Sequence, residues 1–106
     1  MVAGDEIAPA FTKKPFIHEE ENGNKLVFEC HLIANPKPDI AWYHEEKRLR
    51  EDVRTAIKSI EVDPHKYNVT LELKDVTEND KGQYRISAQN KRGEVSATIN
   101  LTFIRK

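Results

Sequence analysis

Cysteine is nearly absent from this sequence: Cys30 is the only one among 106 residues, so no internal disulfide can form. Small secreted domains usually carry paired cysteines because their compartment oxidises thiols, which makes a reducing, cytoplasmic setting the better expectation. Two Asn-x-Thr sequons, at Asn68 and Asn100, would be candidate glycan sites in a secreted protein. Such short patterns arise often by chance, and we interpret both as ordinary strand residues.

Long hydrophobic runs and an excess of one charge are also missing. No apolar stretch approaches the roughly 20 residues that span a bilayer, and residues 1–6 lack the basic flank and apolar stretch of a signal peptide. Lysine and arginine number 17 against 18 for aspartate and glutamate, which leaves a formal net charge of -1. Neither nucleic acid nor a membrane is therefore expected as a partner.

Glycine is scarce, and the sequence has none of the Gly-rich loops that bind phosphate. Only four glycines occur, and no P-loop or dinucleotide-binding pattern is present. No serine, threonine or cysteine lies in a nucleophile motif with a histidine and a carboxylate. The histidines share no metal-ligand spacing, and we expect them to be solvated surface residues: His18, His31, His44 and His65. We expect no enzyme activity, no metal and no cofactor.

Several short windows carry an apolar residue at every second position, which is the period of half-buried β-strands. They lie at residues 26–32, 69–73 and 95–103, and clusters of Asn, Gly, Pro and Asp separate them. No window repeats at the helical period, although residues 44–52 could form a turn of helix with only Leu49 to bury. The pattern predicts an all-β sandwich.

The length suits one domain. Residues 1–8 show no alternation, and we assign them as linker or vector-derived residues. The domain is predicted to cover residues 9–103, and residues 104–106 are assigned to a C-terminal linker.

Three features in a fixed order point to a particular sandwich. Cys30 lies at an inward position of one predicted strand, Trp42 lies on the next, and the motif Asp80-Lys81-Gly82-Gln83-Tyr84 precedes the penultimate strand. This order resembles that of immunoglobulin-like domains, in which the tryptophan packs across the core and the tyrosine forms a corner. The resemblance implies that Asp80, Gly82 and Tyr84 make up this tyrosine corner.

Finer details resemble the intermediate set (I-set) of this family, as found in titin, twitchin and their relatives. They are the proline turn at residues 35–38, the run Leu71–Val76, and Asn90 with Gly93 at the last hairpin. The resemblance implies two antiparallel sheets in Greek-key order.

Ile86 occupies the position where disulfide-bonded members of the family carry their second cysteine. Packing against Cys30 would therefore replace the disulfide. The expected core residues are Cys30, Trp42, Leu71, Leu73 and Ile86.

The resemblance implies a non-catalytic module, one immunoglobulin-like repeat of a giant sarcomeric filament protein that acts as spacer, mechanical element and docking surface. Its expected partners are neighbouring domains of the same chain and sarcomeric proteins such as myosin or actin, and the domain alone is expected to be monomeric. One alternative is an intracellular regulatory or scaffold module, either beside a kinase or in an actin-crosslinking protein. Another is an extracellular adhesion domain without its disulfide.

Two basic pairs are candidate docking residues on end loops: Lys47 with Arg48, and Lys91 with Arg92. The alternative for each pair is a solvated polar surface. Because no concave apolar site is predicted, binding is expected at strand edges or end loops.

Two further expectations follow from the resemblance. Arg54 should pair with Asp80 near the corner. A strand at residues 16–20 should pair in parallel with the last strand, at residues 94–103, so that a pull on the two ends loads this ladder in shear.

Overall fold

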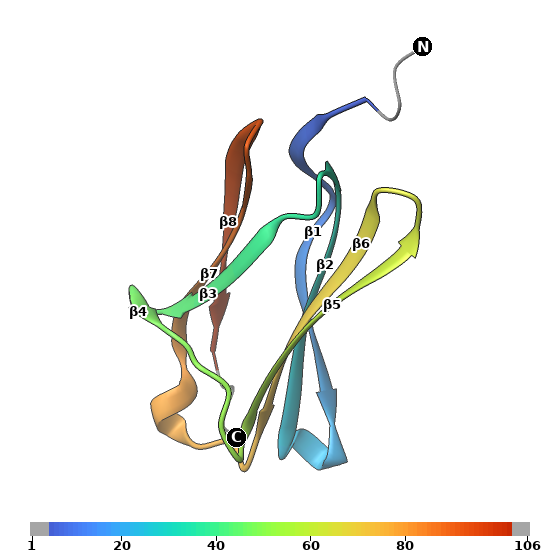
Figure 1. Cartoon of the computed structure of the whole chain (residues 1–106). Coiled ribbons are helices and arrows are strands. Elements are labelled where there is room, and N and C mark those ends of the chain that lie inside the picture. Colours follow the sequence, from blue (N-terminus) through green and yellow to red (C-terminus); the bar gives the residue numbers. More distant parts are fainter. Residues whose placement is uncertain (1–4, 103–106) are drawn as a thin grey trace.

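The structure is a computed structural model that describes residues 5–102. Eight strands form two four-stranded antiparallel sheets packed face to face (Figure 1). Sheet A has the order β1-β2-β6-β5, and sheet B has the order β4-β3-β7-β8. The strands are β1 (Ile7–Glu20), β2 (Lys25–Asn35), β3 (Asp39–His44), β4 (Lys47–Arg48), β5 (Thr55–Asp63), β6 (Lys66–Lys74), β7 (Gly82–Asn90) and β8 (Gly93–Leu101).

Two 3-10 turns complete the regular structure of the described residues: η1 (Glu21–Gly23) and η2 (Glu78–Asp80). The chain passes between the sheets three times, after β2, β4 and β6. The predicted all-β sandwich of two antiparallel sheets is confirmed.

Alternation along the strands builds the core between the sheets. In β2 and β6 every second side chain points inward and is buried. The Trp42 ring lies 6.1 Å from the Phe28 ring in an edge-to-face arrangement, and the Tyr84 ring lies 4.4 Å from the Phe28 ring. Such aromatic groups bury large apolar areas and hold the two layers together. All five expected core residues are buried: Cys30, Trp42, Leu71, Leu73 and Ile86.

Residues 44–52, which could have formed a turn of helix, begin with a hairpin. β3 and β4 pair through Tyr43 with Arg48 and through His44 with Lys47. The two loop residues, Glu45 and Glu46, have φ values of 51° and 68°. This turn continues the right-handed twist of the strands, as primed turns do. The sequence allowed a turn of helix here, and the chain forms a hairpin instead, in keeping with the predicted all-β fold.

The expected parallel pairing of residues 16–20 with residues 94–103 is also wrong. In the described part of the chain, β1 pairs with β2 and β8 pairs with β7. The reason is local: Glu20 pairs with Lys25, so a short turn returns the chain at once and holds the second half of β1 against β2. A tight turn fixes the neighbour as well as the register.

The ends of the predicted domain compare with the structure in different ways. β1 begins at Ile7, so it includes Ile7 and Ala8, which the sequence placed in the linker. The predicted last residue, Phe103, lies outside the described residues, as do residues 1–4 and 104–106.

Candidate functional site

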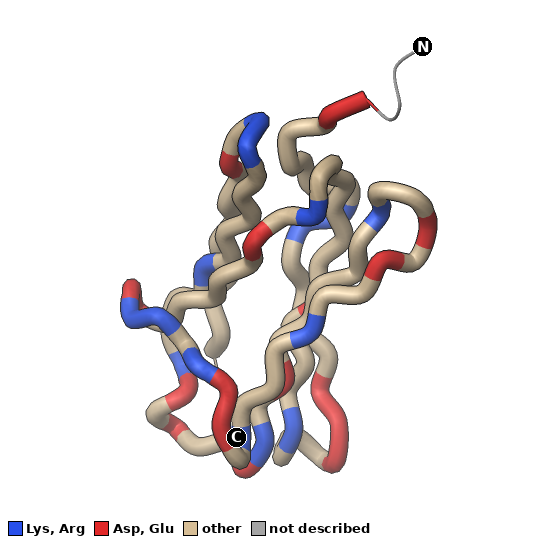
Figure 2. Tube along the Cα trace, in the orientation of Figure 1, with Lys and Arg blue, Asp and Glu red and all other residues tan. Residues whose placement is uncertain are grey.

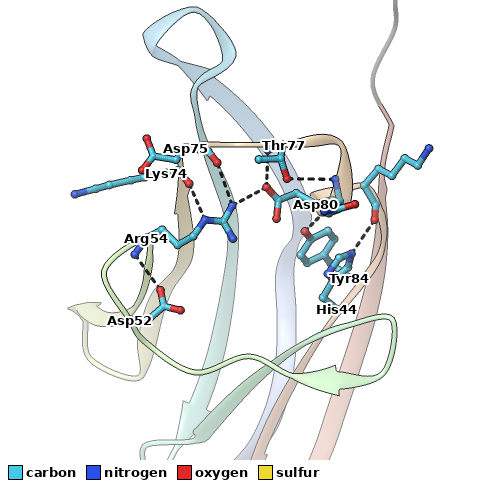
Figure 3. Close-up of polar contacts among 10 residues, drawn as sticks. His44, Asp52, Arg54, Lys74, Asp75, Thr77, Asp80 and Tyr84 are labelled. Carbon is cyan, nitrogen blue, oxygen red and sulfur yellow. Dashed lines mark hydrogen bonds and ion pairs between the residues drawn. The ribbon is translucent and has the colours of Figure 1, made fainter.

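The tyrosine corner lies where η2 leads into β7 (Figure 3). The Tyr84 hydroxyl donates a hydrogen bond of 2.5 Å to the Asp80 carbonyl oxygen. Burial raises the pKa of Tyr84 above its usual range, so the phenol keeps its proton. The ring is buried in the core, and its hydroxyl bonds the backbone of the turn. This bond fastens the turn ahead of β7 to the core.

The Asp80 carboxylate organises the backbone around this corner. Its Oδ2 accepts hydrogen bonds from the Thr77 backbone N–H at 2.8 Å and from Arg54 Nη2 at 2.6 Å. The Thr77 side chain in turn accepts from the Asn79 backbone N–H, so Thr77 and Asp80 form a capping box around η2. The pair expected between Arg54 and Asp80 is therefore present.

Arg54 links the loop before β5 to both sides of the corner. Its Nε donates to the Lys74 carbonyl oxygen at 3.1 Å, and its Nη2 also donates to the Asp75 carbonyl oxygen at 3.4 Å (Figure 3). The guanidinium thus donates hydrogen bonds to carbonyl oxygens at the end of β6, in sheet A, and to the Asp80 carboxylate ahead of β7, in sheet B. All these bonds stay within the domain, so the cluster serves to hold the two sheets together.

Gly82 and His44 complete the corner. Gly82 has a φ of 125°, a backbone conformation that favours glycine, and the Glu45 carboxylate lies against it. The His44 ring stacks on Tyr84 at 4.3 Å, and its Nε2 donates to the Lys81 carbonyl oxygen at 2.8 Å. His44 is thus half-buried and remains at the surface while it makes these contacts within the domain.

Two other histidines share one carboxylate on the outer face of sheet A. His31 Nε2 lies 2.7 Å from Glu29 Oε2, and His18 Nε2 lies 3.2 Å from Glu29 Oε1. Hydrogen bonding from His31, with a smaller contribution from His18, lowers the pKa of Glu29. The spacing of Glu29 and His31 on one strand face was a signal that we did not use. Among residues 5–102 no group of three or more His, Cys, Asp or Glu side chains could hold a metal ion.

The two candidate docking pairs lie at opposite ends of sheet B and differ in what surrounds them (Figure 2). Lys47 and Arg48 are exposed on β4. Lys91 and Arg92, in the turn between β7 and β8, both contact the Glu6 carboxylate. Arg92 Nη1 lies 3.8 Å from Glu6 Oε1. The ion pair with Lys91 lowers the pKa of Glu6.

The contact of Glu6 with this turn belongs to a larger clamp on the segment ahead of β1. Asn90 Nδ2 donates to the Ile7 carbonyl oxygen at 2.9 Å and to the Pro36 carbonyl oxygen at 3.0 Å. Asn35 Nδ2 donates to the Asp5 carbonyl oxygen at 2.5 Å. The sequence analysis missed Glu6 because its partners lie at the other end of the chain.

The lone thiol is enclosed by the core. Cys30 is fully buried, and burial raises its pKa to about 12. Nucleophilic and metal-binding chemistry of cysteine uses the thiolate, which is not formed at neutral pH under these conditions. Cys30 therefore acts as a small apolar residue.

Two packed antiparallel sheets, a tryptophan across the core and a tyrosine corner together define an immunoglobulin-like sandwich module. The family model of the immunoglobulin I-set domain matches residues 9–103, and the chain belongs to this family.

Known proteins agree with this assignment. Titin of Drosophila melanogaster is 31% identical over 96 residues, which cover 90% of this chain and 0% of titin after rounding. A fibroblast growth factor receptor of Halocynthia roretzi is 34% identical over 86 residues, with 80% of this chain and 10% of the receptor covered. The solved structure of titin domain M4 is 25% identical with a TM-score of 0.78, and the match covers 92% of this chain and 96% of that one.

The chain thus spans at most a tenth of the length of either of these two relatives. No helix in the described part of the chain is long and apolar enough to cross a bilayer.

Proposed function

We propose that this chain is a non-catalytic structural and docking module, one immunoglobulin-like repeat of a giant muscle filament protein in the cytoplasm of the sarcomere. The observation that carries the proposal is an I-set domain whose lone cysteine is buried, with Ile86 in the core in place of a second cysteine. A module without a disulfide suits a reducing compartment. Its likeness to titin favours a muscle protein.

The corner supports a structural role in place of a catalytic one. Its polar groups, from Arg54 to Tyr84, bond to each other and to backbone, so they are already engaged in holding the fold. The Cys30 thiol is protonated and enclosed. A reaction would need a free nucleophile or base beside a substrate.

The course of the chain supports a role as spacer. The start of β1 lies beside the turn between β7 and β8, because Asn90 bonds to Ile7. The end of β8 lies at the other end of the sandwich, where Leu101 pairs with Gly82 beside the corner. Entry and exit at opposite ends (Figure 1) let such modules follow one another in a row, with neighbouring domains as first partners.

Docking of sarcomeric proteins such as myosin or actin is proposed for Lys47 and Arg48. These two side chains are exposed on the short strand β4. Lys91 and Arg92, by contrast, share the Glu6 carboxylate and are partly neutralised. Glu45 and Glu46 lie beside Lys47 and Arg48 but bond to Gln83 and Arg85, so the two cations are available to an acidic partner surface.

Expression of the parent protein in muscle cells tests this proposal. We expect striated localisation of the wild type, and weaker binding of a muscle-filament fraction to the double variant Lys47→Glu with Arg48→Glu. A matched double variant, Lys14→Glu with Lys66→Glu, changes the same charge at exposed sites of sheet A and should bind like the wild type. Diffuse localisation, or equal binding by all three proteins, would contradict the proposal.

An extracellular module is the alternative that one observation favours, namely the likeness to a growth-factor receptor. Asn100 is exposed on β8 and would be open to glycosylation there. Mass spectrometry of the native protein decides between the two, because a glycan at Asn100 requires passage through the secretory pathway.

A further inference from the structure

The four outer strands of the two sheets differ in how far their free edges are covered. They are β1 and β5 in sheet A, and β4 and β8 in sheet B. β1 lies against β8 and covers its edge, and β1 itself carries Pro9 and Pro15. β4 has only two residues, which leave little backbone to pair. The long strand β5 remains, and within the described residues β6 is its one paired strand.

The second half of β5 presents unpaired backbone groups along its free edge. The Ile57 N–H points to this side, because it bonds to the Glu51 carboxylate at 3.1 Å, in the loop ahead of the strand. Backbone groups alternate between the two sides of a strand, so the N–H and C=O of Ser59 and Glu61 point the same way. No described residue bonds to these groups. Another strand can add to such an edge.

Charged side chains usually guard an edge, but those of this segment are drawn elsewhere. The Glu61 carboxylate accepts a hydrogen bond from the His65 N–H at 3.0 Å, within the hairpin between β5 and β6. The Lys58 ammonium lies 3.9 Å from the Glu72 carboxylate, on β6. The end of this hairpin stands apart from sheet B (Figure 1), and β5 contains no proline or glycine. This edge is therefore open.

Two exposed apolar side chains lie beside the open edge. Among the described residues three large apolar side chains are exposed, and two of them, Ile60 and Val62, belong to β5. Ile60 pairs with Asn68 on the outer face of sheet A, and Val62, two residues further on, lies on the same face. Apolar side chains that gather at one place on a surface are typical of a contact with another protein.

Charges at the two ends of this segment give a partner its direction. Lys58 is exposed, and it shares the Glu72 carboxylate with Lys25, which lies closer to it at 3.5 Å. The Asp63 carboxylate forms no hydrogen bond or ion pair with another described residue. The edge thus presents a cation at its start, two apolar side chains, and an anion at its end. A complementary segment carries the opposite charges at its two ends.

We propose that the edge of β5 at residues 58–63 binds an extended segment of a partner protein, which adds to sheet A as a further strand. Antiparallel addition is favoured, because parallel pairing is less stable. The partner segment then begins with a basic residue opposite Asp63 and ends with an acidic residue opposite Lys58. Between them, apolar residues lie opposite Val62 and Ile60. Backbone hydrogen bonds supply the affinity, and the apolar and charged side chains supply the specificity.

NMR titration of the 106-residue chain with the peptide Arg-Val-Thr-Val-Thr-Glu, blocked at both ends, tests this strand addition. We expect saturable shifts along β5 and a Kd of about 1 mM. Bound peptide should slow hydrogen exchange at the Ser59 and Glu61 amides, but not at the Ile60 amide, which already bonds to β6. The peptide Glu-Val-Thr-Val-Thr-Arg, with exchanged end charges, should bind at least about threefold more weakly. No saturable shift up to about 5 mM peptide, or shifts on another strand instead, would overturn the proposal.

Variants separate the contribution of the apolar side chains from that of the backbone. Ile60→Thr with Val62→Thr keeps β-branched residues in the strand and should weaken peptide binding at least about fivefold. Val53→Thr is the matched control, since Val53 is 97% exposed in the loop before β5, and it should bind like the wild type. Ser59→Pro removes an N–H that points away from β6, so the sheet should tolerate it while binding falls about tenfold. Equal binding by the double variant and the wild type would contradict the apolar contact, and it would leave the docking proposed for β4, in the other sheet, standing.

Discussion

At the scale of single residues, Trp42 has the largest fully buried side chain of the core, yet its indole N–H has no hydrogen-bond partner among the described residues. Trp42→Ala should lower the free energy of unfolding by about 3 to 5 kcal/mol, since it opens a cavity. Trp42→Phe should cost less, because it keeps a ring against Phe28 and removes an unpaired polar group. Denaturant titration of the three proteins measures both, and equal losses for the two variants would contradict this account.

Cys30 should make stability depend on pH in alkaline solution. Burial raises its folded-state pKa to about 12, against about 8.5 for a free thiol in the unfolded chain. Between these values the unfolded chain has lost a proton that the folded chain keeps, so stability falls as pH rises. The wild type should lose up to about 1.4 kcal/mol per pH unit above pH 8.5 relative to Cys30→Val. Unfolding curves at pH 7 to about pH 10 check this, with parallel behaviour expected below pH 8.

The core positions of Cys30 and Trp42 and the corner at Tyr84 could be predicted from the sequence, because these residues occur in a recognisable order. The ion pairs of Glu6 could not. Nothing in the sequence around Glu6 indicates Lys91 as its partner over any other cation. The pairing depends on the tertiary fold, which brings the turn between β7 and β8 beside the start of β1. The carboxylate shared by His18 and His31 likewise depends on which strand lies beside β2.

At the scale of elements, alternation predicted the strands and their inner faces but not every neighbour. The side-chain period specifies which face is buried. It does not say whether the second half of β1 lies against β2 or β8. The turn at residues 21–24 decides this, and its geometry depends on positive φ at Glu21, Asn22 and Gly23. Only Asn22 and Gly23 signal such a turn in sequence.

The hairpin between β5 and β6 offers a test of turn chemistry. Pro64 precedes His65, which has a φ of 66°. Glycine adopts this conformation more easily than histidine does. His65→Gly should raise the free energy of unfolding by about 0.5 to 1 kcal/mol, because relief of this conformation outweighs the added entropy of the unfolded chain. The backbone bonds made by the His65 N–H and C=O remain. His65→Ala is the control for the lost side chain and should not gain stability in thermal unfolding.

At the scale of the whole molecule, the corrected pairing of β1 changes which bonds carry a pull on the ends. Force at the start of β1 draws that strand along β2, and force at the end of β8 draws it along β7. Each ladder is loaded in shear, so bonds worth only about 0.5 to 1.5 kcal/mol each must break together. Ile17→Pro, opposite Phe28 in the first ladder, should lower the unfolding force in single-molecule pulling.

Val53→Pro is the control for that experiment, since Val53 is 97% exposed in the loop before β5 and takes no part in a ladder. It should unfold at the force of the wild type. Without a disulfide at Cys30, roughly 95 residues should extend in one step, a contour of about 300 Å. Gradual opening at low force, or a shorter step, would contradict the shear account.

The clamp on the segment ahead of β1 should respond to salt. Asn35 and Asn90 hold the Asp5 and Ile7 carbonyl oxygens, and Glu6 is tied to the turn at Lys91. Residues 5–7 are therefore held against the domain by contacts from two different loops. The exposed part of this clamp is ionic and is screened by salt. The hold on residues 5–7 should weaken as ionic strength rises, while the fold itself stays unchanged.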